Sequence, residues 1–221
     1  MSILPSFAEL AGTPGVSLDV LSLALAVEFR DVDAAWAMER LDGLGVELSR
    51  ALERKDGTAR VQMRTCAELL YGQHGFVGDS QQYDHPDNSM LDLVLAKRRG
   101  LPILLSVVYV EVARRAGVPL AGVGLPGHFV VGHFGVDPPL LLDPFAGGST
   151  VETGKTGGLV RPWPASEIAM RMLNNLVAAY QRRGDLGAAI RAARMRLALP
   201  SDESLRKVLR AEMRAMQAQL N

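Results

Sequence analysis

Apolar residues recur every three to four positions over most of this chain, and they form short continuous runs only near its middle. A period of three to four residues predicts amphipathic helices with one buried face. The first 15 residues contain two prolines and two glycines and predict an irregular start. The helices predicted ahead of the middle span residues 20–29, 32–48, 60–71 and 89–97, and Gly72 ends the third of them.

The stretch from residue 98 to 145 holds the most apolar segment of the chain and predicts a buried helix that begins at Pro102. Proline suits the first turn of a helix, because the N–H that it lacks would have no partner there. Arg114, Arg115 and Gly117 suit the helix end, where cations and a left-handed residue are favoured.

Two short β-prone runs, residues 129–131 and 140–142, follow the buried helix and predict strands. His128 stands directly before the first run, and Asp143 stands directly after the second. We therefore expect neighbouring strands to bring this histidine and this carboxylate together. His133 follows His128 by five residues, and the alternation of side chains along a strand places the two on opposite faces.

The chain from Ser166 onward predicts a helical tail with a turn at residues 183–185 and a last, charged helix over residues 203–220. The spacing of its apolar and small residues resembles one tetratricopeptide hairpin. A single hairpin is too short for a solenoid, so we expect it to pack on the core or to cap it. The predicted domains are residues 1–165 and the tail, residues 166–221.

Composition narrows the classes of function. Lys plus Arg and Asp plus Glu are 24 each, which argues against nucleic acid as the main partner. No apolar stretch approaches the roughly 20 residues of a membrane span, and the first residues lack the pattern of a signal peptide. Cys66 is the single cysteine, so no internal disulfide forms. We expect a cytoplasmic protein without a membrane association.

Cofactor and metal motifs are weak. Residues 122–127 match a glycine-rich dinucleotide pattern, but Pro126 and the strand that follows argue against that loop. Gly154-Lys155-Thr156 lacks the earlier glycine of a phosphate-binding loop. No spacing typical of zinc ligands is present, so we predict neither a cofactor nor a metal.

Three pieces of the middle stretch occur together: Arg-Gly-x-Pro-Ile at 99–103, Pro-Gly-His-Phe at 126–129 and Leu-Asp-Pro-Phe at 142–145. In this combination the chain resembles SirB-type bacterial proteins, which have a transglutaminase-like core, over roughly residues 60 to 205. The resemblance implies an α+β fold. A helical N-terminal layer would precede a transglutaminase- or papain-like core with a small antiparallel sheet, and a C-terminal helical hairpin would follow.

By the same resemblance, His128 matches the catalytic base and Asp143 the carboxylate that orients it. The pattern places a nucleophilic cysteine about two residues after a glycine like Gly100, where this chain has Pro102. A proline cannot act as a nucleophile. The resemblance therefore implies the fold and two members of a triad, but it does not imply an activity.

Two other residues could supply a nucleophile, and each has a plainer interpretation. Cys66 lies on an apolar helix face, where a buried structural cysteine is the commoner case. Ser106 is the first hydroxyl inside the buried helix, and a helix-interior hydroxyl usually bonds to a carbonyl of its own helix.

Asn88 and Ser89 lie at the start of the helix predicted over 89–97, and two interpretations are possible. The favoured interpretation is that one of them caps this helix, because Asn and Ser are strong helix caps. The resemblance also places this loop at the border of the cleft, so the candidate binding residues are Asn88, Ser89, Pro102 and Ser106.

Two hypotheses of function remain open from the sequence. In the first, the protein is a non-catalytic binding or regulatory module for a peptide-like ligand or a protein partner. In the second, it is a hydrolase or acyl-transferase that uses His128 and Asp143 with an unidentified nucleophile. A purely structural pair that ties two strands is a third role for these residues. The sequence does not indicate an oligomeric state.

Overall fold

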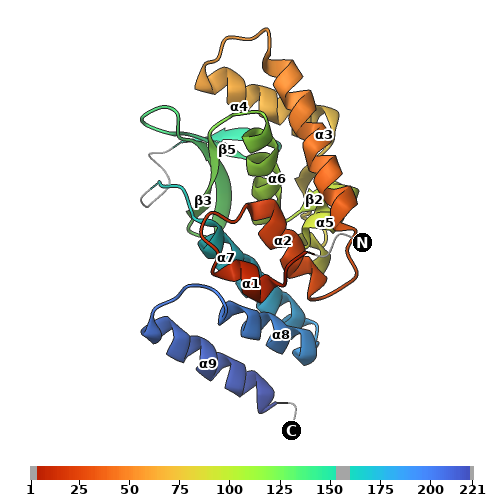
Figure 1. Cartoon of the computed structure of the whole chain (residues 1–221), viewed down its shortest axis with the longest axis vertical. Helices are drawn as coiled ribbons and strands as arrows, with labels where there is room; N and C mark the ends of the chain where they lie inside the picture. Colours follow the sequence, from red (N-terminus) through yellow and green to blue (C-terminus); the bar gives the residue numbers. More distant parts are fainter. Residues whose placement is uncertain (1–3, 153–159, 220–221) are drawn as a thin grey trace.

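The computed structural model describes residues 4–152 and 160–219 and shows an α+β fold in which helices come before and after an antiparallel sheet (Figure 1). The helices ahead of the middle stretch are α1 (Phe7–Ala11), α2 (Leu18–Val27), α3 (Ala34–Leu52), α4 (Ala59–Ala67) and α5 (Leu91–Lys97). The tail contains α7 (Ala165–Arg182), α8 (Leu186–Arg196) and α9 (Glu203–Gln217).

The main sheet has the strand order β3-β4-β5-β6, and every neighbouring pair is antiparallel. Its strands are β3 (Leu120–Leu125), β4 (His128–His133), β5 (Leu140–Asp143) and β6 (Ser149–Val151). A separate two-residue ribbon pairs β1 (Val77–Gly78) with β2 (Arg99–Gly100) in parallel. This ribbon leads directly into the next helix and fixes where that helix begins.

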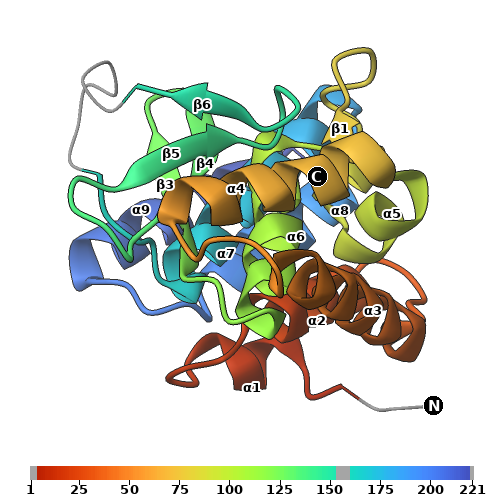
Figure 2. The same cartoon turned by 90° about the horizontal axis from the view of Figure 1, so that it is seen from above.

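The helix α6 (Pro102–Arg115) lies at the centre of the molecule, between α2 and α3 on one side and the sheet on the other (Figure 2). Every residue from Pro102 to Ala113 is buried. Such a helix is apolar all round because it has no solvent face. Phe129 and Val131 cover it from the sheet side, and Leu41 and Leu44 of α3 belong to the same apolar core.

Two carboxylates, Asp19 of α2 and Glu111 of α6, are buried beside this core. The guanidinium of Arg115 donates to Asp19 at 2.7 Å, to Glu111 at 2.9 Å and to Asp42 of α3 at 2.6 Å. Gly45 of α3 leaves room for that side chain, since a Cβ there would lie 2.5 Å from Arg115 Cβ. The cation at the end of α6 therefore joins three helices through ion pairs.

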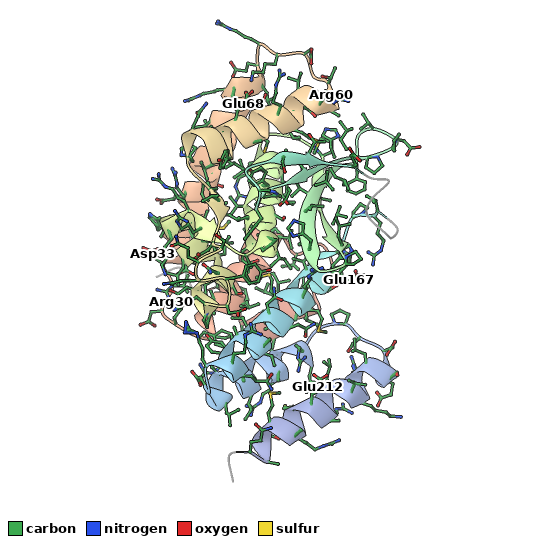
Figure 3. The ribbon with its side chains drawn as sticks, turned by 180° about the vertical axis from the view of Figure 1, so that it is seen from behind. Arg30, Asp33, Arg60, Glu68, Glu167 and Glu212 are labelled. Carbon is green, nitrogen blue, oxygen red and sulfur yellow. The ribbon has the colours of Figure 1, made fainter. Side chains whose placement is uncertain are left out.

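The tail packs on the rest of the chain. Met172, Leu173 and Leu176 of α7 share one apolar core with α6, and Ala189 and Ala193 of α8 extend it. The helical hairpin expected from the sequence is therefore present and contacts the core, whereas its likeness to a tetratricopeptide unit and the division into two domains stay predictions. Helix α9 lies farthest from α4, and its Glu212 is labelled in Figure 3.

The structure corrects the sequence prediction at several elements. The supposedly irregular start contains α1, whose Ser6 and Glu9 form a capping box and whose Phe7 is buried. The third helix is α-helical only to Ala67 and continues as a π-helical turn, η1 (Glu68–Gln73), so Gly72 does not end it. The spacing of apolar residues in the sequence cannot distinguish an α-helix from a short π-helical turn.

The sheet is also larger than the two predicted strands. Residues 122–127 belong to β3 and to the turn that follows it, where Gly127 has a φ of 68°, and do not form a nucleotide loop. β6 was not predicted from the sequence. Gly154-Lys155-Thr156 lies outside the described residues. None of the described helices is long and apolar enough to cross a membrane.

Replacing Arg115 by alanine should greatly lower the urea concentration at which half of the protein is unfolded. The change leaves two buried carboxylates with only the exposed Arg114 as a cationic partner, and breaking a buried ion pair costs about 3–5 kcal/mol. Arg114 is the matched control, because it contacts the same carboxylates but its side chain is 53% exposed, against 11% for Arg115. Arg114→Ala should cost about 1 kcal/mol or less in urea unfolding. Equal losses for the two variants would contradict the assignment.

Candidate functional site

The side chains of His128 and Asp143 meet at the ends of two neighbouring strands. His128 begins β4 and Asp143 ends β5, and the register pairs Val131 with Leu142. His128 Nε2 lies 2.7 Å from Asp143 Oδ2. The structure thus brings together the two residues that the sequence placed at adjacent strand ends, while their chemical role stays a prediction.

The Asp143 carboxylate is held by the turn that follows it. Its Oδ1 accepts the backbone N–H of Phe145 at 2.9 Å and that of Ala146 at 3.3 Å. The other oxygen, Oδ2, therefore faces His128 and accepts a hydrogen bond from Nε2–H. Nδ1 of His128 has no hydrogen-bond partner among the residues described, and this side chain is 33% exposed. The ring thus offers one free nitrogen at the surface.

Aromatic rings surround this pair. The Phe145 ring stands edge-on to the His128 ring, with 6.5 Å between centroids, and contacts Tyr83 at 5.9 Å. Phe145 packs over Gly78 of β1, where a Cβ would lie 2.4 Å from the ring. The sequence analysis missed Phe145 and Tyr83, although Phe145 belongs to the Leu-Asp-Pro-Phe piece that drew attention to Asp143.

The structure supplies no activated nucleophile at the start of α6. Pro102 is the first residue of the helix, as predicted. Ser106 is fully buried, and its Oγ donates to the Pro102 carbonyl at 2.8 Å. Cys66 is fully buried in α4, and burial raises the pKa of its thiol to about 12. Because the thiolate is the reactive form, this cysteine is inert in the folded protein.

The predicted cap of α5 is wrong. Asn88 and Ser89 lie in a 3₁₀ turn, η2 (Pro86–Ser89), and the N-cap of α5 is Met90, which makes no side-chain capping bond. Asn88 instead donates to the Gln82 carbonyl at 2.7 Å and to Asp79 at 3.2 Å. Its amide thus fixes the loop that carries Tyr83.

Ser89 borders a small cavity of about 220 Å³ between this loop and α7. Leu101, the residue before α6, also lines it, together with Asn175 on α7. The cavity therefore reaches the helix start where the resemblance places a nucleophile. Of the four candidate binding residues, Ser89 alone lines this cavity.

His133 faces away from His128, as strand alternation predicts. Its Nε2 lies 2.7 Å from Gln62 Oε1, and its Nδ1 accepts the N–H of Gly135 at 3.2 Å. In the part of the chain that the structure describes, no cluster of three or more His, Cys, Asp or Glu side chains could hold a metal ion. A zinc-type site needs such convergence.

A larger cavity of about 470 Å³ lies between the α4–η1 segment and β5. The sequence analysis missed it, because η1 and β5 approach only in the fold. Arg60 and Glu68 mark its rim on α4 and η1 (Figure 3). Near it, the Tyr109 hydroxyl is buried without a hydrogen-bond partner among the described residues, and burial raises the pKa of this phenol.

The comparison with protein families agrees with this layout. The family model described as the transglutaminase-like superfamily matches residues 35–176, which include α6, His128 and Asp143. The chain belongs to the transglutaminase-like superfamily. Its mixed α+β architecture, with the four-stranded antiparallel sheet and the C-terminal helices, is therefore a superfamily core with additions.

The similar curated proteins are named without an activity. A "UPF0162 protein" of Xylella fastidiosa strain 9a5c is 34% identical over 169 residues, which cover 75% of this chain and 60% of that protein. Its counterpart in strain Temecula1 is 32% identical over 212 residues, covering 86% of this chain and 75% of the relative. This chain thus spans less than two thirds of the first of these relatives.

A shorter similarity reaches a eukaryotic protein. "F-box only protein 21" of Homo sapiens is 40% identical over 63 residues, which are 28% of this chain and 10% of that protein. No solved structure matches the chain.

The Cys66 thiol should resist alkylation in the folded state. Burial raises the thiol pKa to about 12, so only a small fraction of the thiol is ionised at pH 8. Iodoacetamide should therefore react with Cys66 at least about a hundredfold more slowly than with a free cysteine, because the thiolate is the reactive form. Labelling should become complete in denaturant, as followed by intact mass. Rapid labelling of the folded protein that disappears in His128→Ala would instead establish a thiol–imidazole pair.

The free energy of unfolding should decrease as the pH is lowered, because of His133. Burial lowers the pKa of this imidazole below its ordinary 6.5, so the neutral ring is the form that folds best. Its contribution is complete above pH of about 6.5 and is lost as the pH falls through the depressed value. Between about pH 7 and 5, His133→Gln should flatten the free energy of unfolding against pH. The control His128→Gln should keep that slope, and an unchanged slope in His133→Gln would refute the claim.

Proposed function

We propose that this chain is a SirB-type, non-catalytic member of the transglutaminase-like superfamily that binds a peptide-like ligand or a protein partner beside His128. One observation carries the proposal. The imidazole–carboxylate pair is intact at 2.7 Å, while a proline stands at the position where the superfamily pattern places the attacking residue. A site with a base and no nucleophile can bind the substrate class of its relatives without reacting.

The protonation pattern of His128 suits a peptide. Asp143 accepts a hydrogen bond from Nε2–H, so a neutral ring presents Nδ1 as a hydrogen-bond acceptor. A backbone N–H of an extended ligand is the matching donor. The rings of Phe145 and Tyr83 next to it provide apolar contact for a ligand side chain.

The tail is the second element of the proposal. Helices α7 and α8 form a hairpin on the core, and α9 extends it at one end of the molecule (Figure 1). We assign this tail to a protein partner, in keeping with its likeness to a tetratricopeptide hairpin. A cytoplasmic setting accords with a single free thiol.

The intact His128–Asp143 pair also favours one alternative, a hydrolase or acyl-transferase. That activity needs a nucleophile from outside the described residues, because Ser106 is committed to its own helix and Cys66 is buried. A water molecule activated by His128 or a group on the ligand would serve this role.

The test uses protein with labelled histidine and a pool of random hexapeptides. The His128 ring signals should shift on addition of the pool, and those of the buried His133 should not. His128→Ala should abolish binding, and mass spectrometry of the incubated pool should show no cleavage or acyl transfer. Turnover that is lost in His128→Ala would replace the proposal by the enzymatic alternative.

A further inference from the structure

Arg171 of α7 is a partly buried cation with almost no polar partner. Its guanidinium lies over the rings of Phe129, at 5.4 Å from the centroid, and Trp163, at 5.8 Å. One donor, Nη1, reaches the carbonyl of Leu125 at 3.3 Å. The Nε and Nη2 edge, which is the fork that holds a carboxylate with two bonds, has no acceptor among the described residues.

The contrast with Arg115 shows what is missing at Arg171. Burial acts to lower the pKa of Arg115, but hydrogen bonds to Asp42 and Asp19 outweigh it and the net shift is upward. For Arg171, burial lowers the pKa and no carboxylate in the described chain offsets it. A cation taken partly out of water without a counter-ion costs free energy, which a bound anion would recover.

Arg171 and His128 are connected through the β3–β4 hairpin. Leu125, whose carbonyl accepts from Arg171, is the cross-strand partner of His128 in the β3–β4 hairpin. Paired residues of neighbouring strands lie about 5 Å apart. A second path runs through the aromatic rings, since Tyr83 acts electrostatically on Arg171 and contacts Phe145, which contacts His128.

The cavity at the start of α6 continues along the same face of α7. Asn175 follows Arg171 by one helical turn, and Asn175 lines this cavity together with Tyr83 and Leu101. Residues four apart on a helix lie on one face. The guanidinium therefore lies one helical turn beyond this cavity along α7, and Leu125 connects it to the hairpin that carries His128.

We propose that Arg171 binds the terminal carboxylate of a peptide-like ligand whose preceding residues lie against His128. The inference rests on the proposed function and names its ligand class, a chain with a free C-terminal carboxylate. The planar two-donor fork matches a carboxylate, and the two aromatic rings hold the guanidinium plane so that little side-chain freedom is lost on binding.

The experiment compares two pools of N-acetylated random hexapeptides that differ in one group, a free C-terminal carboxylate or a C-terminal amide. The indole N–H signal of Trp163 reports directly under Arg171, and Trp36→Phe removes the signal of the second tryptophan. Both the Trp163 and the His128 signals should shift with the carboxylate pool at a concentration at least about tenfold lower than with the amide pool.

The variant Arg171→Met should remove this preference, and Arg171→Lys, which keeps the charge and loses the fork, should retain only part of it. Arg210→Met is the control, because Arg210 is an exposed arginine of α9 that is paired with Glu203 and lines neither cavity. It should leave the preference unchanged. The comparison of the two pools on the wild-type protein holds even if Arg171→Met fails to fold.

The outcomes separate the two proposals. Equal binding of both pools overturns the role of Arg171 and leaves the binding function of the His128 site in place. Binding of neither pool overturns the proposed function itself. Displacement of the carboxylate pool by inorganic phosphate at an equal concentration overturns the assignment to a carboxylate and points to a phosphorylated ligand.

Discussion

The burial of α6 is the constraint on which the rest of the structure depends. A helix with no solvent face needs apolar residues on every side, so each neighbouring element must present an apolar face to it. The same burial surrounds Glu111, which can stay in the core only because Arg115 and Arg114 lie one turn further along the helix. The helix thus positions the N-terminal layer by ion pairs and the sheet by packing.

The segments before and after α6 form the site. The β1–β2 ribbon precedes α6, and Gly78 in that ribbon leaves room for the Phe145 ring. Beyond the end of α6, the chain returns as β3, β4 and β5 and delivers His128 and Asp143 to adjacent strand ends. A rigid scaffold with a proline at the helix start keeps an oriented imidazole but supplies no attacking atom. This geometry is the basis of the proposed binding function.

Arg115 and Arg171 illustrate how the surroundings decide the role of an arginine. Arg115 is surrounded by three carboxylates and holds helices together. Arg171 has aromatic faces and one carbonyl, and its free donor edge lies near the His128 site. The difference between the two arginines comes from what the fold places opposite each side chain.

Local signals in the sequence determined the start and end of α6, the amphipathic helices and the adjacency of His128 and Asp143, because proline, glycine and side-chain alternation act over a few residues. They also determined that no nucleophile stands at Pro102. Only the tertiary structure decided that Ser89 and Asn88 form a 3₁₀ turn, that α4 continues as a π-turn, and that β3 and β6 complete the sheet. Those features depend on partners far away in the chain, as do the burial of Cys66, the rings around His128 and the unpaired edge of Arg171. A side chain's environment is set by residues that no local pattern contains.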